Sequence, residues 1–297
     1  MSDSQPSPPE GSPNARHRVW GPQFLRRTRS ILENAGAGAQ ELGRRLEQGR
    51  ALREQAGGGF CLMDQREHWD LAVVLDACRY DVFARVNRLP GRLEKRISPG
   101  SSTEEWVEVN CDGDFQDVVY VSASPYVSRL YLEQLGLSVP FAHLEETWKK
   151  GWDENLHTVP PQAVMEAYRR VKTAWPMKRF VLHFMQPHYP FIGATRIGAE
   201  GWRKYWGAIE TEPAELQGAT VYELLEDGRL DPDQVRKAYE DNLRLVLGHV
   251  EALLAERPGR VVVTSDHGEC FGECGVFGHP PGVPLPELIE VPYLLVA

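Results

Sequence analysis

Acidic or histidine side chains follow three short apolar segments that are rich in β-branched residues. The pairs are residues 71–75 with Asp76, residues 180–182 with His183, and residues 261–265 with Asp266 and His267. Such apolar runs predict buried strands, and the carboxyl ends of parallel strands meet at one edge of a sheet. A buried carboxylate is costly unless it is paired or binds a cation. Asp76, Asp266 and His267 therefore predict a site for Zn²⁺ or Mn²⁺.

Each acid, taken alone, could instead cap a helix or a turn, which is a common role of aspartate. The coincidence of three strands that each deliver a ligand-type side chain favours one shared metal site over three separate caps.

A Gly/Ser-rich turn at residues 98–103 supplies a candidate nucleophile. Ser102 and Glu105 have the spacing of a capping box, which would place Thr103 at a helix N-terminus, where an anion is favoured. A hydroxyl is a weak nucleophile near neutral pH, but a bound cation activates it, as zinc lowers the pKa of bound water to about 7. We expect Thr103 to be a metal-activated nucleophile. Ser102 is the alternative nucleophile, and capping is the commoner role for such a cluster.

Several motifs occur in a characteristic order along the chain. They are Leu75-Asp-Ala-Cys-Arg-Tyr-Asp81, Gly100-Ser-Ser-Thr103, Pro187-His-Tyr-Pro190, Ser265-Asp-His-Gly-Glu269 and Phe271-Gly-Glu-Cys-Gly-Val-Phe-Gly-His279. This set resembles the sulfatase-like branch of the alkaline phosphatase superfamily, over most of the chain from about Trp69. The resemblance implies a central mixed sheet between helices and one metal ion. Its ligands would be Asp76, Thr103, Asp266 and His267.

The phosphoethanolamine-transferase members of that branch have two further histidines that contact the transferred group or a second metal. The matching positions here are His188 and His279, although either could be an ordinary surface or core histidine. Glu269 and Glu273 are expected to support or cap rather than to bind metal.

Two further residues are candidates for contacts with the substrate. Arg79 could orient Asp76 or a substrate oxygen, or could instead form a salt bridge with Asp81. Ser102 is the second candidate, because it lies beside the expected nucleophile.

The sequence also departs from parts of the superfamily. The formylglycine frame of true sulfatases does not fit residues 98–103, and Ala77 stands where sulfatases usually have a second Asp. Both departures favour phosphoryl over sulfuryl chemistry. The Asp-x3-His ligand pair of two-metal phosphatases is not found, although His183 is a candidate substitute. The sequence therefore leaves open whether a second metal ion binds.

Bulk composition excludes some partners. The chain has 297 residues and a net charge of −9, which argues against nucleic acid as the main partner. It does not exclude phosphate esters, because a bound metal can reverse the local field. Of five cysteines, Cys270 and Cys274 could make half a zinc site, but reduced thiols are the plainer interpretation. With no transmembrane run and no apolar leader, the expected location is cytoplasmic.

The chain is predicted to have three parts. Residues 1–20 form a disordered tail, 21–58 a helical arm, and 59–297 the catalytic domain. The arm has a weak heptad pattern over residues 23–55 that predicts docking or self-association, with a membrane-surface helix as the lesser alternative. The domain alternates strands and helices, which predicts an α/β three-layer sandwich with a largely parallel sheet. Further strands are expected at 118–121 and 291–297, and helices at 161–174, 212–226 and 233–256.

These observations predict a metal-dependent hydrolase or transferase. Its substrate would be a phosphate mono- or diester, either a small molecule or linked to a glycan or lipid, and the intermediate a phospho-threonine. Alternatives are a sulfate-ester or phosphonate hydrolase, a non-catalytic binding or assembly module, and a cofactor-independent mutase. The chain is short for the extra domain that such mutases carry.

Overall fold

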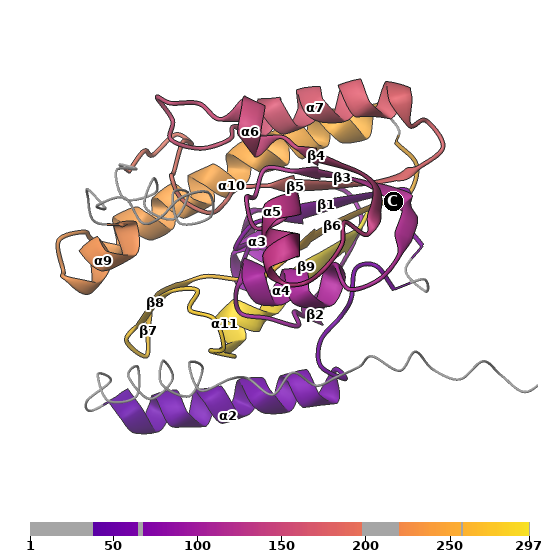
Figure 1. Cartoon of the computed structure of the whole chain (residues 1–297). Helices are drawn as coiled ribbons and strands as arrows, with labels where there is room; N and C mark the ends of the chain where they lie inside the picture. The colour runs from indigo at the N-terminus through magenta and orange to yellow at the C-terminus, as the bar shows by residue number, and fades with distance from the viewer. Residues whose placement is uncertain (1–37, 65–67, 198–219, 257, 297) are drawn as a thin grey trace, which may run out of the picture.

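A computed structural model describes residues 38–64, 68–197, 220–256 and 258–296 (Figure 1). The predicted tail and the first part of the predicted arm, residues 1–37, lie outside the described residues.

Seven of the described strands form one twisted sheet, in the order β2-β9-β6-β1-β5-β3-β4. The strands are β1 (Leu71–Leu75), β2 (Arg92–Ile97), β3 (Phe115–Ser122), β4 (Phe141–Glu146), β5 (Arg179–Phe184), β6 (Val261–Ser265) and β9 (Glu290–Leu295). β9 runs antiparallel to both of its neighbours, β2 and β6, and the other neighbouring strands of this sheet are parallel. A separate hairpin contains β7 (Cys270–Glu273) and β8 (Val276–Gly278).

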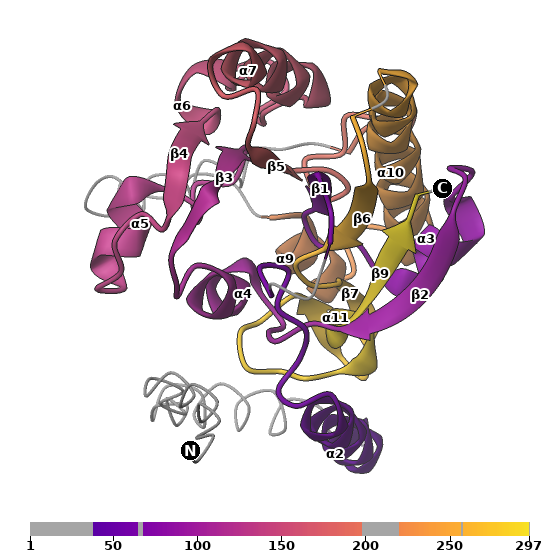
Figure 2. The same ribbon diagram turned by 90° about the vertical axis from the view of Figure 1, so that its right-hand side faces the viewer.

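Helices cover both faces of this sheet (Figure 2). The described helices are α2 (Ala39–Gln55), α3 (Tyr80–Val86), α4 (Thr103–Asn110), α5 (Arg129–Gln134), α6 (Trp148–Gly151), α7 (Pro161–Ala174), α9 (Val221–Glu226), α10 (Pro232–Ala255) and α11 (Pro286–Ile289). α3, α7 and α10 share one apolar core with the sheet, and α4 and α5 share the other. The predicted three-layer α/β sandwich with a largely parallel sheet is therefore confirmed.

Strand β1 shows why the sheet is covered on both faces. Leu71, Val73 and Leu75 belong to the core on one face, whereas Ala72 and Val74 belong to the core on the other. Successive side chains of a strand point to opposite faces, so a strand buried on both sides must be apolar throughout. The residues that follow β1 thus extend from a strand whose five residues are all buried.

Most of the expected elements are present. The predicted strand at 71–75 and helix at 161–174 coincide with β1 and α7, and the strands expected at 118–121, 180–182 and 261–265 lie within β3, β5 and β6. The strand expected at 291–297 overlaps β9, which ends at Leu295. Part of the predicted helix at 212–226 lies outside the described residues, and α9 covers its end. Strands β2 and β4 and the β7–β8 hairpin were not predicted.

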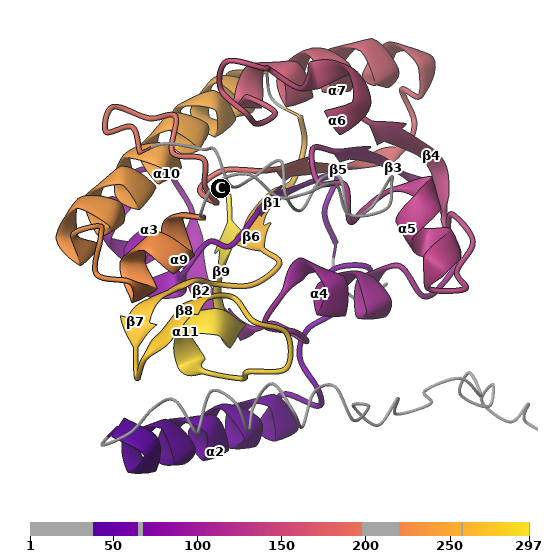
Figure 3. The ribbon, with the colours of Figure 1, turned by 60° about the vertical axis from the view of Figure 1, so that its left-hand side comes forward.

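Helix α2 is the described part of the predicted arm, and it packs beside α11 (Figure 3). Leu42 and Leu46 are buried in a small core with residues of α11. At Gly49 the helix lies directly against the backbone that precedes α11. A Cβ added at Gly49 would lie only 1.4 Å from the carbonyl oxygen of Pro284. The predicted seam at Leu42 and Leu46 thus docks on its own domain, while self-association and the domain boundaries stay predictions.

The contact at Gly49 is testable with a matched glycine in the same helix. We expect Gly49→Ala to destabilise the protein by roughly 1–3 kcal/mol, because the new methyl group collides with backbone. Gly43→Ala should stabilise it by up to about 1 kcal/mol, because nothing lies within 4 Å of an added Cβ there. Urea unfolding measures both free energies. Equal stabilisation by both substitutions would contradict the docked position of α2.

Candidate active site and metal centre

The register of the central strands brings the predicted acids together. β1 lies between β5 and β6, with Leu75 paired to Ser265 and Val74 paired to His183. Asp76 and Asp266 are the next residues along β1 and β6, so they leave neighbouring strands at the same level. This places both carboxylates at the carboxyl edge of the sheet, as predicted.

The turn after β1 is fixed by hydrogen bonds. Ala77 has a positive φ of 57°, which is uncommon for a residue with a side chain. Its N–H donates to Asp266 Oδ1 at 3.1 Å, and its carbonyl oxygen accepts from the Tyr239 hydroxyl at 2.6 Å. The N–H of Cys78 donates to Ser265 Oγ at 2.8 Å. These bonds hold the conformation of the turn that carries Asp76.

Thr103, the first residue of α4, lies directly against the acids. Its hydroxyl donates to Asp266 Oδ2 at 2.8 Å, and its Oγ1 is 3.1 Å from His267 Nε2. His267 Nε2 is in turn 3.5 Å from Asp266 Oδ2 and 3.8 Å from Asp76 Oδ1. Four ligands held at about 2.0 Å from one tetrahedral ion would be about 3.3 Å apart. The four predicted metal ligands therefore converge at a fitting spacing.

The chemistry of this group fits a cation. Asp76 Oδ1 is buried and has no hydrogen-bond partner. His267 Nδ1 bonds the carbonyl oxygen of Gly268 at 2.7 Å, so Nδ1 carries the proton and the Nε2 lone pair faces Thr103. Buried lone pairs that face one another without a donor are costly. A divalent ion bound by Asp76, Thr103, Asp266 and His267 would satisfy them.

Burial and mutual repulsion separate the pKa values of the two carboxylates. Burial, with a contribution from Asp266, raises the pKa of Asp76 well above its usual range. Burial also opposes ionisation of Asp266, but His267 and His183 outweigh it and hold the pKa of Asp266 below its usual range. Two buried carboxylates this close do not both ionise readily without a cation.

His183 lies beneath this group and offers an alternative ligand. Its Nε2 is 3.6 Å from Asp266 Oδ2 and has no hydrogen-bond partner, and its Nδ1 is 2.9 Å from the Tyr120 hydroxyl. Asp76, His183 and Asp266 form one of two three-residue groups in the described chain that could hold a metal.

The second such group contains His188, Glu269 and His279. His279 Nδ1 is 3.1 Å from a carboxylate oxygen of Glu269, and that carboxylate also accepts a hydrogen bond from Tyr222. Burial lowers the pKa of His279, but the Glu269 carboxylate outweighs it and raises this pKa above its usual value. His188 and His279, the two histidines that the family resemblance pointed to, thus lie close together, with their ring centroids 5.1 Å apart.

The loop that carries His188 is attached to both the sheet and α10. The N–H of His188 donates to the carbonyl oxygen of Asp76 at 3.2 Å. Asn242 of α10 donates to the carbonyl oxygens of Pro187 and His188, at 3.1 and 3.0 Å. His188 Nδ1 bonds the carbonyl oxygen of Tyr189 at 2.5 Å, which directs its Nε2 lone pair away from that loop.

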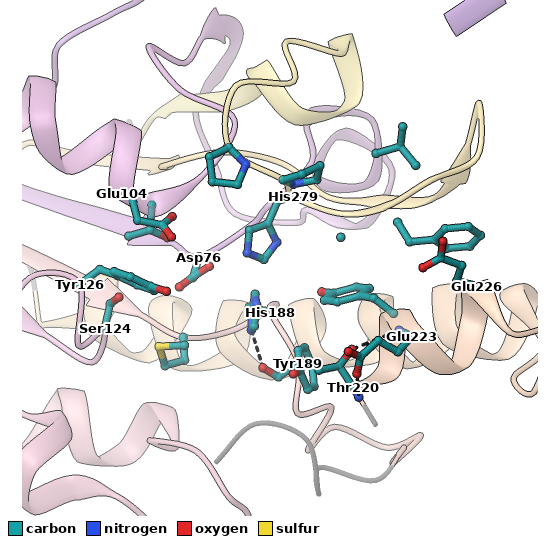
Figure 4. Close-up of a pocket in the computed structure, with 18 of the residues that line it drawn as sticks. Asp76, Glu104, Ser124, Tyr126, His188, Tyr189, Thr220, Glu223, Glu226 and His279 are labelled. Carbon is teal, nitrogen blue, oxygen red and sulfur yellow. Dashed lines mark hydrogen bonds between the residues drawn. The ribbon is translucent and has the colours of Figure 1, made fainter. Parts of the chain in front are cut away.

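A cavity of about 400 Å³ opens over these residues (Figure 4). Asp76, His188 and His279 line its middle, with acidic residues toward both ends, and Thr103 is also among its lining residues. Among the described residues that line it there is no lysine or arginine. On this described wall, an anionic substrate would meet positive charge at histidine or at a bound metal.

The turn before Thr103 differs from the prediction. Ser102 is the N-cap of α4, but its side chain makes no capping bond and its Oγ has no partner. The Glu105 carboxylate instead accepts from the N–H and the hydroxyl of Ser101, at 2.5 and 2.9 Å. The predicted capping box is therefore wrong, because Ser101 competes successfully for Glu105. Ser102 is not among the residues that line the cavity.

Arg79 lies apart from the cavity. Its guanidinium donates to Asp81 at 2.9 and 2.8 Å and to Glu273 at 2.6 Å. Of the two roles left open by the sequence, the salt bridge with Asp81 is the one that is found. Glu273 serves this ion pair, whereas Glu269 contacts His279 and belongs to the second possible ligand group. The acid after Asp-His-Gly was the available signal for Glu269, and no signal pointed to Tyr222.

No family model and no curated protein sequence matches the chain. Among solved structures it is similar to the soluble domain of lipooligosaccharide phosphoethanolamine transferase A from Neisseria meningitidis, with a TM-score of 0.47 and 13% identity over 76% of this chain and 75% of that one. It is also similar to the zinc complex of the EcEptC periplasmic domain from Escherichia coli, with a TM-score of 0.42 and 12% identity over 79% and 74%.

A third similar structure is the phosphoglycerol transferase GacH of Streptococcus pyogenes in complex with sn-glycerol-1-phosphate. Its TM-score is 0.38, with 12% identity over 89% of this chain and 75% of that one. The phosphoethanolamine transferases that the sequence motifs resemble are thus also found by structure.

The cytoplasmic location expected from the sequence is contradicted by these comparisons. The similar E. coli domain is periplasmic, and the whole Neisseria transferase is an integral membrane protein. The expectation rested on unpaired cysteines and a polar first segment, neither of which fixes a compartment. In the part of the chain that the structure describes, no helix is long and apolar enough to cross a membrane.

The ligand set is testable by metal analysis. We expect Asp76→Asn and Asp266→Asn each to weaken zinc binding by roughly 10-fold or more, because each removes a charged ligand. Asp81→Asn is the matched control, since Asp81 is paired with Arg79 outside the cavity. Isothermal titration of metal-free protein with Zn²⁺ measures the affinities. Equal affinity of wild type and both ligand variants would exclude this metal centre.

The burial of Glu105 predicts a pH-dependent stability. Burial raises the pKa of Glu105 from 4.5 to about 7. Its folded-state pKa lies above the unfolded value, so its contribution is fully present below pH 4.5 and is lost as pH rises through about 7. The loss is at most about 3 kcal/mol. Urea unfolding of chelator-treated protein should show this fall in wild type and not in Glu105→Gln. A parallel pH dependence in both proteins would contradict it.

Proposed function

We propose that the protein is a metal-dependent phosphotransferase or phosphohydrolase that uses Thr103 as its nucleophile. The convergence of Thr103 Oγ1 on Asp266 and His267, at 2.8 and 3.1 Å in the wall of a substrate-sized cavity, carries this proposal. A hydroxyl at a helix N-terminus is well placed to receive a phosphoryl group, because the free N–H groups there favour anions. Bound metal would lower the pKa of the Thr103 hydroxyl and neutralise charge on the phosphoryl oxygens.

The chain's own residues can move the protons of both half-reactions. In the first, Thr103 Oγ1 bonds to phosphorus, the bond to the leaving oxygen breaks, and the hydroxyl proton passes to Asp266. The leaving oxygen takes a proton from His279, whose pKa Glu269 raises. In the second, an acceptor hydroxyl gives its proton to that histidine and attacks phosphorus, and Thr103 leaves and recovers its proton from Asp266.

Glu269 supports His279 in this role. A carboxylate that bonds one ring nitrogen orients the imidazole and favours its protonated form, which can donate to a leaving oxygen. The same group of His188, Glu269 and His279 could instead hold a second metal ion. A protonated His279 or a second metal ion would each supply positive charge to a cavity whose described wall has no lysine or arginine.

The nucleophile is testable with p-nitrophenyl phosphate, a p-nitrophenyl phosphodiester and p-nitrophenyl sulfate, with Zn²⁺ or Mn²⁺ added. We expect a phosphate ester to be hydrolysed, and Thr103→Ala to lower kcat by roughly 10³-fold or more. Ser102→Ala should keep most activity, since Ser102 Oγ bonds nothing and does not line the cavity. Peptide mass spectrometry of rapidly quenched enzyme should find a phosphoryl group on Thr103.

Other results of the same assays would favour one of the alternative functions or the alternative nucleophile. Loss of turnover in Ser102→Ala with retention in Thr103→Ala would move the nucleophile to Ser102. Preferred cleavage of the sulfate ester would indicate a sulfatase. Bound metal with no turnover of any ester, even with added acceptor alcohols, would favour a binding module.

A further inference from the structure

The proposed reaction needs His279 at a fixed position relative to Thr103, although the two residues lie on different elements. Thr103 begins α4, whereas His279 follows β8 in the loop that leads to α11. The imidazole is oriented by Glu269, 3.1 Å from its Nδ1, and Figure 4 shows His279 facing His188 across the middle of the cavity. A bond at one ring nitrogen orients the ring, but it does not fix the backbone that carries it.

The loop that follows β8 has little backbone support of its own. Pro280 and Pro281 have no N–H to donate. Among the described residues, no backbone–backbone hydrogen bond includes residues 280–282. The loop is nevertheless packed against the domain, since Val283 is completely buried. Buried backbone groups without partners are costly, so the partners here have to come from side chains.

Ser101 supplies these partners. Its Oγ accepts a hydrogen bond from the N–H of Val283 at 3.1 Å, and its hydroxyl can donate to the carbonyl oxygen of Pro280 at 3.0 Å. Pro281 and Gly282 lie between the two bonded groups, so one side chain holds both ends of this short segment. Ser101 is completely buried, which shields these bonds from water.

Ser101 is also attached to the first turn of α4. Its N–H donates to Glu105 Oε2 at 2.5 Å, and its hydroxyl lies 2.9 Å from the same oxygen, so Glu105 and Pro280 share the hydroxyl proton. Gly100 permits this close packing, because an added Cβ would lie 2.3 Å from the Cβ of Glu105. Thr103 lies between Ser101 and Glu105 in the chain. The Ser101 hydroxyl is therefore fixed relative to the nucleophile.

We propose that Ser101 is a positioning residue that holds His279 at the distance from Thr103 that protonation of the leaving oxygen requires. This inference rests on the proposed function and deepens it, because it assigns control of the proton-transfer step to a residue that does not line the cavity. In an in-line displacement the leaving oxygen departs opposite the nucleophile. A proton donor must lie within hydrogen-bond reach of that oxygen, so a small shift of the His279 loop impairs this step.

The dependence of the rate on the leaving group tests this role. p-Nitrophenolate departs without a proton, whereas the more basic phenolate gains from one. The two esters are compared by kcat/KM, in the class of phosphate ester that wild type hydrolyses. Ser101→Ala should lower the value for the phenyl ester roughly 10-fold more than the value for the p-nitrophenyl ester. Because both substrates are measured with one preparation, a loss of folded protein cancels from the ratio.

Ser128→Ala is the matched control for this ratio. Ser128 is also a completely buried serine, but its hydroxyl caps α5 and it does not line the cavity. The substitution should keep the wild-type ratio of the two esters. The same selective loss in Ser128→Ala would overturn the proposal, as would an unchanged ratio in Ser101→Ala.

A double substitution tests whether Ser101 acts through His279. His279→Ala should show the same selective loss with the phenyl ester, because it removes the proton donor. Adding Ser101→Ala to that variant should change the ratio by about twofold or less, since residues that act through one another are not additive. Two losses that multiply would separate Ser101 from His279 and overturn the proposal.

Hydrogen exchange followed by mass spectrometry tests the attachment of the loop without turnover. Ser101→Ala should speed exchange at the N–H of Val283 by roughly 5-fold or more, because that group loses its partner. Ser128→Ala should leave this exchange unchanged. Unchanged exchange in Ser101→Ala would refute the attachment, even if wild type hydrolyses both esters. Faster exchange with no ester turnover by wild type would confirm the attachment, but it would refute the proposed catalysis and the role of Ser101 in it.

Discussion

The need to compensate buried negative charge governs this structure. Asp76, Asp266 and Glu269 are between 0 and 3% exposed, and the cavity that Asp76 lines has no lysine or arginine on its described wall. An uncompensated buried carboxylate costs several kcal/mol. The nearby histidines contribute lone pairs as well as protons, so a bound divalent cation would complete the balance. The register of β1 with β6 and the bonded turn at Ala77 hold the carboxylates at this costly separation.

The centre of the site could be predicted because its chemistry follows directly on apolar strands. The sequence places Asp76 and Asp266 at strand ends, and parallel strands end at one edge. The order of the strands could not be read in this way, because it depends on pairing between residues far apart in the chain. β2 was missed for the same reason: its residues, Arg92–Ile97, are largely polar, and its partner β9 lies near residue 290.

Local sequence patterns also failed where a side chain bonds a different partner from the one that the pattern predicts. Ser102 and Glu105 satisfy a local capping pattern, yet Glu105 bonds Ser101, which in turn contacts the Pro280 carbonyl oxygen and the Val283 N–H. Those distant contacts fix the turn before Thr103. The contact between Glu269 and Tyr222 was not predicted, because the two residues are 47 positions apart in the chain. Such partners have no sequence spacing that would reveal them.

The place of β9 in the sheet has a consequence for biosynthesis. β9 lies between β6 and β2 and is the last described strand to leave the ribosome. Until residues 290–295 emerge, β6 has an open edge and β2 has no neighbour in the sheet. Asp266 and His267 are therefore translated before the sheet beside them can close. An unfinished chain that lacks residues 290–295 presents this open edge to other nascent chains, and an open edge is a template for aggregation.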